Sequence, residues 1–510
     1  MKIVLINVSG QLSSDGSRLI SALLKRAGHP VKSVFLARQE PLKYEPYELE
    51  LLDEILKETD LVMLAVYSSY SIRAVQVTEY VHKRYPGLKV IWGGPHCISV
   101  PDLVLRYADG VCYSEGDQVV LDFVNKMESG ENYLDTPNMA FNVNGSQVVN
   151  NVLPPFSDLD SLPYYDYSLE NQFLLDHKLS PITKEKLRER HAGYPYYVPM
   201  LYSLTSRGCP NKCSYCNNCR YVTMFGHNSM RFHSVDRVIE ELEFILGQFD
   251  FFRLIGFADD DFFMRSTEQL EDFAIKYKSR VGLPFGVALS ARTYSKKKLE
   301  ILLDSGLMLV QMGVQSGSQR ILDEVYDRKI QIQKTKQVIR QIAPYKKTYG
   351  LELLLDFIVD NPYETKNDIM KTYRSLVDLP AHIKVNLFSL AFFPGTPIYE
   401  RALQDGIIES FSEKTSRFYT RSDIRYQQNY ETFLILFLRF LRSNPALRAY
   451  IPKFIMRALG TGPVRAVASI FTKEFYSLLC KRIQKVPKQR LTSMRAQADH
   501  ICKSCRTEPK

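Results

Sequence analysis

The sequence predicts an α/β protein built on two mainly parallel sheets that follow one another along a chain of 510 residues. Two observations predict this fold: short β-rich runs alternate with helical stretches over residues 1–127, and a strand–helix unit repeats about six times over residues 200–400. A third observation, a basic amphipathic end after residue 406, predicts a helical region. The length is too great for one ordinary domain, so we expect three main parts joined by a connector.

Residues 1–135 are predicted to form a Rossmann-like domain. Amphipathic segments such as Ser17–Ala27 and Val75–Tyr85 separate the expected strands, which are 2–8, 31–36, 60–66, 88–92 and 110–113. Ligands of such folds bind beyond the carboxyl ends of the strands. The loops at that edge would be Val8–Gly16, Tyr67–Ser71, Gly93–Cys97 and Ser114–Asp117.

Residues 136–195 are expected to join the first domain to the second. They begin with a predicted hairpin over 138–152, which turns at Asn144-Gly145, and continue as a Pro/Tyr-rich connector that wraps over the surface. Residues 196–405 are predicted to form a partial, TIM-like (β/α)6 barrel. Such barrels carry their chemistry at the carboxyl ends of the strands.

Residues 406–510 are predicted to be a basic helical region. Residues 411–510 contain 20 Lys and Arg against 6 Asp and Glu, so the whole surplus behind the net charge of +10 lies there. Apolar stripes over 433–471 are interrupted by Arg or Lys, which is typical of a helix lying on a membrane surface or of a helical cap packed on the barrel. No apolar stretch reaches the length of a membrane span.

Overall composition predicts a globular protein of the cytoplasm. Hydrophobic residues make up 45% of the chain and charged residues 24%, and nine cysteines occur without a secretory signal. Association with the inner face of the membrane is the alternative that the basic helices allow. Cys502 and Cys505 form a C-x2-C pair for which Cys480 and His500 are conceivable partners, but a frayed, reduced terminus is the expectation.

Cys209, Cys213 and Cys216 have the spacing C-x3-C-x2-C. Three thiolates can hold three irons of a cubic iron–sulfur cluster and leave the fourth iron open to a small molecule, whereas an electron-transfer cluster normally has four. The alternative is a zinc site completed by Cys219, although structural zinc sites usually place a longer spacer between two cysteine pairs.

The cysteine triplet opens a series of motifs that resembles the radical S-adenosylmethionine (radical SAM) superfamily over about residues 200 to 400. Five further elements follow in the order of that superfamily: Phe257-Ala258-Asp259-Asp260-Asp261-Phe262, Ser290-Ala291-Arg292, Gly313-Val314-Gln315-Ser316-Gly317-Ser318, Asn361-Pro362-Tyr363-Glu364-Thr365 and Phe393-Pro394-Gly395-Thr396-Pro397. The resemblance implies a 4Fe–4S cluster on the three cysteines, with S-adenosylmethionine (SAM) on the open iron.

The same resemblance implies SAM-binding residues, which are Asp259, Asp260, Arg292, Gln315 and Ser316. A carboxylate of the aspartate pair could accept hydrogen bonds from the SAM ammonium group, and the arginine fork could bind the SAM carboxylate. The alternatives are that the aspartates cap the next turn and that the arginine is a surface residue. The family usually has Glu where Gln315 stands, so this side chain keeps an acceptor but no charge.

The first domain resembles the cobalamin-binding domain that precedes the barrel in one branch of radical SAM enzymes. The resemblance rests on two loops, and it implies cobalamin contacts from Gly93, Gly94, Pro95, His96, Glu115 and Gly116. The D-x-H-x-x-G motif that supplies a cobalt-ligating His in mutase-type proteins is absent. The loop of His96 favours close approach of the backbone to the corrin over ligation of cobalt, and a solvent-facing His96 is the alternative. The missing motif also permits a domain that has lost cobalamin.

The resemblance implies an enzyme that cleaves SAM reductively to a 5′-deoxyadenosyl radical, for methyl transfer to an unactivated carbon of a hydrophobic, lipid-like or natural-product substrate. A radical cyclase or rearrangement enzyme is the first alternative. A tRNA methylthiotransferase would need further cluster cysteines upstream, where only Cys97 and Cys112 lie, so no nucleic-acid partner is expected. A zinc- or corrinoid-binding interaction protein is the non-enzymatic alternative. The expected partner is a one-electron donor of the flavodoxin or ferredoxin kind.

Overall fold

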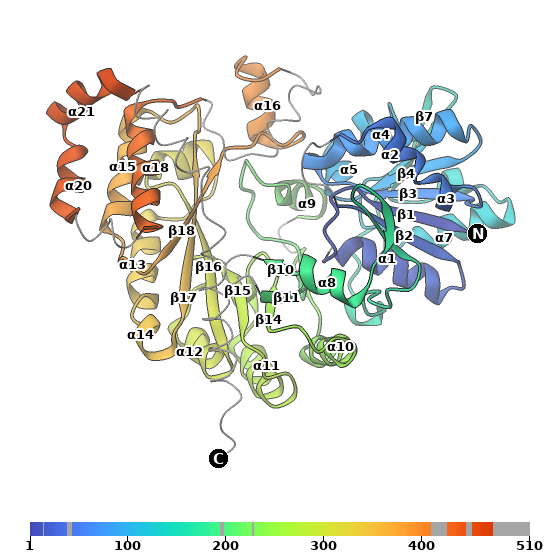
Figure 1. Cartoon of the computed structure of the whole chain (residues 1–510), viewed down its shortest axis with the longest axis horizontal. Coiled ribbons are helices and arrows are strands. Elements are labelled where there is room, and N and C mark those ends of the chain that lie inside the picture. The colour runs from blue at the N-terminus through green and yellow to red at the C-terminus, as the bar shows by residue number, and fades with distance from the viewer. Residues whose placement is uncertain are drawn as a thin grey trace.

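Two sheets stand side by side in the computed structural model. It describes residues 1–13, 15–37, 43–193, 198–226, 229–409, 426–444 and 451–472. The first sheet and its helices lie at the right of Figure 1, and the second sheet lies to their left. The α/β fold with a partial parallel barrel, predicted from the alternation of strands and helices, is confirmed.

The first sheet has the strand order β7-β6-β5-β4-β3-β1-β2-β8-β9. Its core strands are parallel and read as continuous apolar runs because helices cover both faces. β2 and β3 lie on opposite sides of β1. The direction in which successive strands are added to the sheet reverses at this point, and such a reversal leaves a crevice at the carboxyl ends of the strands. The strands are β1 (Ile3–Asn7), β2 (Val31–Leu36), β3 (Leu61–Ala65), β4 (Lys89–Gly93), β5 (Gly110–Cys112), β6 (Met139–Val143), β7 (Ser146–Val149), β8 (Gln172–Leu175) and β9 (Leu179–Pro181).

The segment expected to connect the domains completes the first sheet at both edges. The hairpin β6–β7 pairs antiparallel with β5, and β8 adds a parallel strand beside β2. The Pro/Tyr-rich stretch is therefore partly built into this sheet. The helices of the first domain are α1 (Asp15–Arg26), α2 (Pro46–Glu50), α3 (Asp53–Leu56), α4 (Ser71–Arg84), α5 (Pro95–Ser99), α6 (Pro101–Val104) and α7 (Val120–Ser129).

The second sheet has the order β10-β11-β14-β15-β16-β17-β18, with β11 and the five strands after it all parallel. Its strands are β10 (Ala192–Gly193), β11 (Val198–Ser203), β14 (Leu254–Phe257), β15 (Phe285–Leu289), β16 (Leu307–Gln315), β17 (Glu352–Val359) and β18 (Lys384–Ser389). A small pair, β12 (Ser206–Arg207) and β13 (Arg231–Phe232), stands apart.

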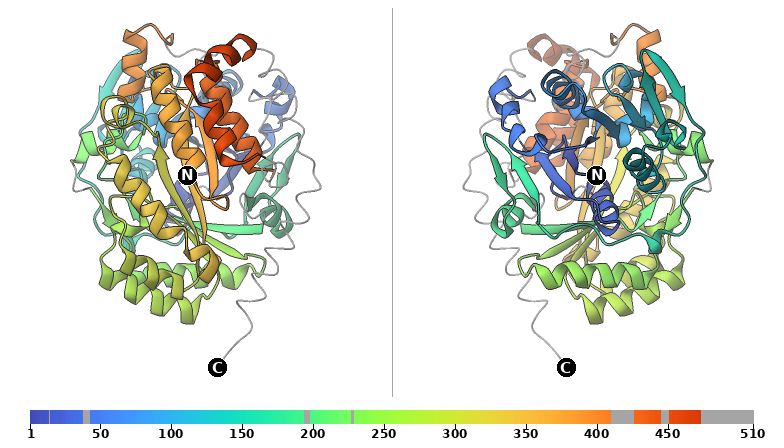
Figure 2. Two further views of the ribbon diagram at one scale, coloured as in Figure 1. Left: turned by 90° about the vertical axis from the view of Figure 1, so that its left-hand side faces the viewer. Right: turned by 90° about the vertical axis from the view of Figure 1, so that its right-hand side faces the viewer.

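Helices cover the outer face of this sheet, as Figure 2 shows from two sides. They are α8 (Lys184–Arg190), α10 (Val235–Gln248), α11 (Thr267–Arg280), α12 (Lys296–Asp304), α13 (Ile332–Ile342), α14 (Tyr345–Tyr349) and α15 (Lys366–Asp378). Two further helices, α9 (Asn218–Phe225) and α16 (Pro397–Gln404), lie beyond the ends of the strands in Figure 1. Val310, Met312 and Val314 of β16 enter the core beneath the covering helices. Because side chains alternate along a strand, the residues between these face the inside of the barrel.

A helix of the basic C-terminal region packs on the barrel. The apolar face of α18 (Tyr430–Arg442) lies against α15, and Arg442 donates hydrogen bonds to the carbonyls of Pro380 and Ile383 at 2.7 and 2.9 Å. This part of 433–471 is thus a helical cap. Further along, the described residues form α20 (Lys453–Leu459) and α21 (Gly462–Ala468).

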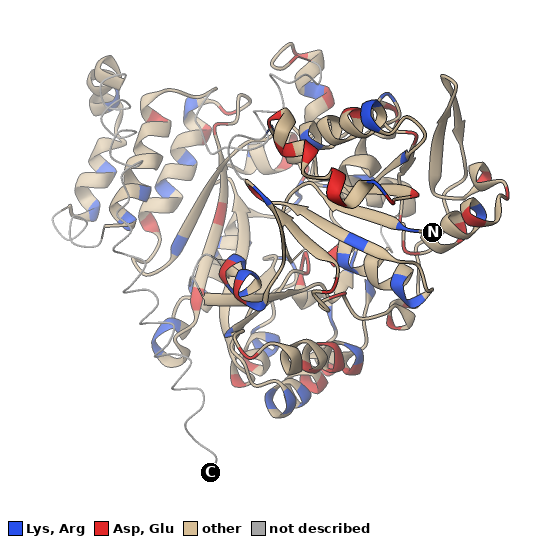
Figure 3. Ribbon diagram, turned by 45° about the vertical axis from the view of Figure 1, so that its right-hand side comes forward, with Lys and Arg blue, Asp and Glu red and all other residues tan. Residues whose placement is uncertain are grey.

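No helix among the described residues is long and apolar enough to span a membrane. Cys480, His500, Cys502 and Cys505 lie outside the described residues. Figure 3 shows acidic and basic residues interspersed along the outer helices of the barrel.

Candidate active site

A cavity of about 500 Å³ lies inside the barrel, and the three cysteines of the triplet line it. Their loop runs from β12 to α9 and crosses the carboxyl ends of the strands. Gly208, just before Cys209, has φ +91°, and a Cβ there would lie 2.7 Å from the carbonyl oxygen of Ser229. Only glycine therefore allows the loop to turn this tightly against its neighbour.

The thiols of the triplet differ from that of Cys219. Cys209, Cys213 and Cys216 face the cavity, whereas Cys219 lies on α9, is buried, and does not line it. Burial raises the pKa of Cys209 and raises that of Cys216 to about 12, so these thiols would release protons on binding metal. Three thiols on the wall of one cavity fit a cubic cluster that takes three protein ligands.

The consecutive aspartates after β14 have three different environments. Asp259 is buried and accepts hydrogen bonds from the Thr205 amide and hydroxyl, both at 2.6 Å, and from Arg265 at 2.9 Å. Asp261 caps a short turn by accepting from the Phe263 amide at 3.1 Å. These two carboxylates therefore hold loops in place.

All three aspartates contribute to the cavity lining, and Asp260 is the one whose side chain is exposed. Its side chain lines the barrel cavity, and its carboxylate accepts a hydrogen bond from Asn218 at 2.8 Å. Desolvation by the surrounding cavity walls raises the pKa of Asp260 to about 6, and the negative charges of Asp259 and Asp261 raise it further. Of the aspartate pair in the sequence prediction, Asp260 is the one placed to meet a ligand.

The other predicted SAM contacts fall into two groups, those that line the barrel cavity and those that do not. Gln315 lines the cavity at the carboxyl end of β16 and has φ +67°, a strained conformation for a residue other than glycine. Arg292 is exposed, does not line the cavity, and donates to the carbonyl of Lys329 at 3.3 Å. Ser316 is buried and accepts from the Ser318 amide at 3.1 Å. Only Gln315 of these three reaches the cavity.

Sequence reasoning missed Arg328. Its guanidinium lines the barrel cavity and donates to the Tyr215 hydroxyl at 2.8 Å, the Gly313 carbonyl at 2.9 Å and the Cys213 Sγ at 3.8 Å. A Cβ on Gly313 would lie 3.2 Å from this side chain, so the glycine gives the arginine room. A cation beside the cysteines is a better candidate for binding a carboxylate than the predicted Arg292.

Sequence reasoning also missed a polar group inside the barrel. Gln311, Asp356 and Asn386 come from the neighbouring strands β16, β17 and β18, and all line the cavity. The signal was present, because Gln311 and Asp356 interrupt apolar strands at positions that alternate with the buried ones.

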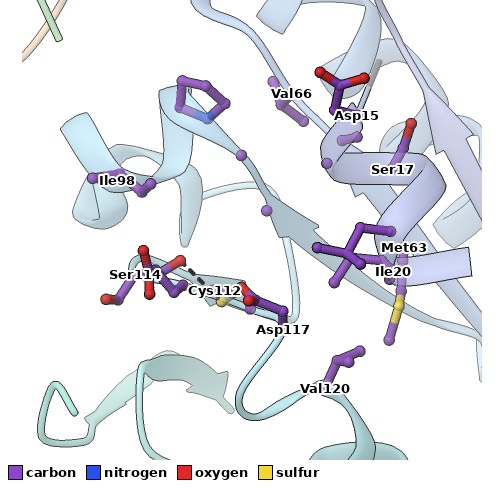
Figure 4. Close-up of a pocket in the computed structure, with 18 of the residues that line it drawn as sticks. Asp15, Ser17, Ile20, Met63, Val66, Ile98, Cys112, Ser114, Asp117 and Val120 are labelled. Carbon is purple, nitrogen blue, oxygen red and sulfur yellow. Dashed lines mark hydrogen bonds between the residues drawn. The ribbon is translucent and has the colours of Figure 1, made fainter. Parts of the chain in front are cut away.

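A second cavity, of about 370 Å³, lies at the carboxyl edge of the first sheet. Figure 4 shows how Ile20 and Met63 approach it from one side, with Ile98 on the other. Asp15 also lines it, and one carboxylate oxygen of this side chain is buried without a hydrogen-bond partner among the described residues. Burial, with Glu241 nearby, raises the pKa of Asp15 to about 8. An apolar slot with an unsatisfied polar atom fits a large, mostly apolar ligand that carries hydrogen-bond donors.

Most of the predicted cobalamin contacts line this second cavity: Gly93, Gly94, Pro95, Glu115 and Gly116. Gly94 has φ +102°, and a Cβ there would lie 2.9 Å from the carbonyl oxygen of Val66. His96 is buried outside the cavity lining, its Nδ1 lies 3.1 Å from the Ser68 hydroxyl, and burial lowers its pKa to about 4.

Ion pairs join the two cavities across the domain boundary. Glu115 is held by Arg231 of β13 at 2.6 and 2.8 Å, and Asp117 is held by Arg207 at 2.8 Å. Arg207 and the cysteine loop are adjacent in the chain. Asp260 lines both cavities, so the two spaces meet at this carboxylate. We call the two ion pairs and Asp260 the seam.

Comparisons with known proteins agree with this geometry. The sequence model of the Radical SAM superfamily matches residues 203–376. An uncharacterized methyltransferase of Pyrococcus horikoshii, PH0819, is 27% identical over 69% of this chain and 71% of its own length. The cobalamin-dependent radical SAM methyltransferase TokK of Streptomyces tokunonensis is 22% identical over 71% of this chain, which spans about half (51%) of TokK.

A solved structure shares the fold of the whole chain. The cobalamin-dependent SAM radical enzyme OxsB, with aqua-cobalamin and SAM bound, superposes with a TM-score of 0.66. The match covers 99% of this chain and 79% of OxsB at 12% sequence identity, so it concerns the fold alone.

Proposed function

We propose that this chain, whose residues 203–376 match the sequence model of the Radical SAM superfamily, is a cobalamin-dependent radical SAM methyltransferase. In the proposed reaction one SAM is cleaved reductively to methionine and a 5′-deoxyadenosyl radical, which takes a hydrogen atom from an unactivated carbon of a hydrophobic substrate and becomes 5′-deoxyadenosine. The methyl group of a second SAM, which leaves as S-adenosylhomocysteine, passes to that carbon, and the electron donor supplies two electrons in all. The observation that carries the proposal is the meeting of two cavities at Asp260: one lined by three cysteine thiols, the other an apolar slot. Two cofactors bound there would face one another across the seam.

In the barrel, six of the polar residues that line the cavity have a proposed role in binding the cluster or SAM. Cys209, Cys213 and Cys216 would ligate the cluster, and Arg328 would bind the SAM carboxylate. The amide of Gln315 would accept from a ribose hydroxyl. Asp260 would accept from the SAM ammonium or from the substrate at the seam. When bound, the cluster supplies the electron that cleaves SAM, and the corrinoid carries the methyl group.

The second cavity would hold the corrinoid by burial and by hydrogen bonds. The apolar side chains of Ile20, Met63 and Ile98 would exclude water from its faces. The free carboxylate oxygen of Asp15 would accept a hydrogen bond from an amide of the ligand. No His lines this cavity among the described residues, so cobalt would be bound without a protein imidazole.

Two partners follow from the proposal. Reductive cleavage needs a one-electron donor, for which small flavodoxin- or ferredoxin-like proteins are the expected class.

A peripheral membrane contact is proposed at α20, α21 and the turn after them, where Phe454, Val467 and Ile470 are more than 60% exposed. The basic side chain of Lys453, on α20 beside Phe454, would favour an anionic surface.

Anaerobic reconstitution with iron, sulfide and hydroxocobalamin tests the proposal. We expect a brown protein with bound corrin that, with dithionite and SAM, forms 5′-deoxyadenosine and S-adenosylhomocysteine. A colourless protein that binds one zinc ion and leaves SAM intact would contradict it. Deoxyadenosine without bound corrin would keep the radical enzyme but reject cobalamin.

A further inference from the structure

A carboxylate stands in the middle of the barrel cavity, held from both sides by amides. Asp356 of β17 accepts a hydrogen bond from Gln311 Nε2 at 2.7 Å and another from Asn386 Nδ2 at 2.9 Å. Each neighbour uses one carboxylate oxygen. An ionised carboxylate offers about four acceptor positions, so roughly half of its capacity stays open toward the cavity.

The charge of Asp356 is not neutralised by its neighbours. Both donors are neutral amides, and no ion pair of this carboxylate occurs among the described residues. Burial raises its pKa, and the positive charge of Arg328 opposes that rise only in part. A partly buried carboxylate with neutral partners gains most from a cationic donor.

Asp356 lies at the level that Arg328 reaches through the Gly313 carbonyl, and deeper than the proposed ribose contact Gln315. It pairs in register with Gly313, whereas Gln315 pairs with the next residue of β17, and the cysteine loop lies beyond the strand ends. Gln315 is thus the outermost inward-facing residue of β16, and Asp356 lies about one pleat further into the barrel.

Below this carboxylate the cavity is apolar. Leu309 and Leu354 continue the inner faces of β16 and β17, and Met200 and Leu254 complete the layer on β11 and β14. A ligand that reached Asp356 with a charged end would find hydrocarbon surface next to it.

We propose that Asp356, oriented by Gln311 and Asn386, is the specificity residue of this enzyme and binds an ammonium group of a substrate whose remaining part is apolar. The inference rests on the proposed radical SAM function of the same cavity. It names the substrate class as amines with a hydrophobic body.

The test uses the reconstituted full-length enzyme with SAM bound and three probes of one shape: 4-phenylbutylamine, 4-phenylbutan-1-ol and 4-phenylbutanoate. Binding is measured by calorimetry under anaerobic conditions. We expect the amine to bind at least tenfold more tightly than the alcohol, and the carboxylate probe most weakly. Asp356→Asn should remove this preference and leave SAM affinity unchanged.

Glu352→Gln provides the matched control, because Glu352 lies on the same strand, pairs with Lys346 and Lys384, and does not line the cavity. It should keep the amine preference. Asp356→Ser, which retains an acceptor but no charge, replaces the asparagine variant if that one fails to fold.

Three outcomes would overturn the inference: no amine preference in the wild type, an unchanged preference in both Asp356 variants, or a loss of SAM affinity in them. The last would assign Asp356 to the SAM site. Each leaves the proposed function standing, since that function fails only if the wild type assembles no cluster or leaves SAM uncleaved.

Discussion

The two cavities are built on opposite principles. The cavity of the first sheet has apolar walls, and its acidic rim residues Glu115 and Asp117 are paired across the seam. In the barrel cavity, polar side chains project from the middle of the strands. The first suits a large ligand held by surface contact, and the second suits charged groups bound one by one.

The seam explains how such different sites can serve one reaction. Arg207 and Arg231 flank the cysteine loop in the fold and bind the rim of the other cavity. The rim of one cavity and the ligands of the other are therefore fixed by the same ion pairs. The predictions below test each cavity alone and then the seam.

The largest effect is expected from the cysteines. Cys213→Ala should abolish the iron–sulfur absorption of the reconstituted protein, because three ligands are the minimum for a cluster with one open iron. Iron content measures the result, and bound corrin should persist. Cys219→Ala is the control, since this thiol does not line the cavity; loss of the cluster there would revive a four-thiolate site.

Filling the second cavity should remove bound corrin and leave the iron–sulfur cluster in place. Ile20→Trp or Val120→Trp would occupy the slot, and we expect bound cobalamin to fall at least tenfold while iron content stays the same. Corrin absorbance of the purified protein measures this. Val149→Trp, on the exposed face of β7, should change neither cofactor. Full corrin loading of the filled variants would place cobalamin elsewhere.

Arg328→Gln should weaken SAM binding roughly 10- to 100-fold, the range expected for a lost charge-assisted hydrogen bond of about 1.5–3 kcal/mol. Equilibrium dialysis of the cluster-loaded protein measures the affinity. Arg292→Gln, at the exposed position favoured by sequence alone, should have no effect. The reverse ranking of the two variants would restore the sequence-based assignment.

At the seam, Glu115→Gln should lower the free energy of unfolding by about 3–5 kcal/mol, because it leaves Arg231 buried without its counter-charge. Although burial alone would raise it, Arg231 and Arg207 hold the pKa of Glu115 below its usual range. The pair therefore stabilises the protein fully above about pH 4.5, and this stability is lost as the pH falls through the lowered pKa.

Denaturant titrations at pH 7 and pH 4 measure the seam prediction. The difference between wild type and Glu115→Gln should shrink at the lower pH. Glu243→Gln, which breaks an exposed pair with Arg280, is the control and should leave the midpoint nearly unchanged. A Glu115 variant as stable as the wild type would mean that the seam does not hold the domains.

The smallest effect concerns His96. Burial lowers the pKa of His96 to about 4. As the pH falls from 6.5 to 4, the unfolded chain therefore takes up a proton at this site that the folded chain does not, and the free energy of unfolding decreases. His191 and His233 have similar pKa values, so His96→Gln should remove only about a third of the loss. Thermal unfolding against pH measures it. A changed corrin spectrum would instead indicate a role at cobalt.

The sequence was sufficient to predict the fold and the cysteine triplet, which follow from the order of motifs along the chain. It was not sufficient to predict which other side chains point into the cavity. The cysteine spacing and the strand–helix alternation were enough for the fold and the cavity-facing triplet. Arg292 was favoured because a motif named it, yet its side chain points to solvent, and Arg328 fills the position near the thiols from another loop. One sequence cannot reveal which arginine the chain brings inward.

The aspartate run shows the same limit. Asp259, Asp260 and Asp261 are the same residue type at consecutive positions, so the sequence does not distinguish their roles. Their hydrogen-bond partners do: Asp259 anchors a loop, Asp260 is exposed in the cavity, and Asp261 caps a turn. Asp356 can be recognised in the sequence, because its carboxylate interrupts the apolar run of β17. Its role depends on Gln311 and Asn386, which are adjacent only in the folded sheet.

The completion of the first sheet by β8 and β9 has a consequence for how the protein is made. A ribosome that has released only residues 1–135 has exposed a sheet with open edges at β2 and β5. Those edges close after residue 181 has emerged, and Arg207 and Arg231 are translated later still. Nascent chains should therefore need chaperone protection until the barrel begins, and corrin should load after translation rather than during it.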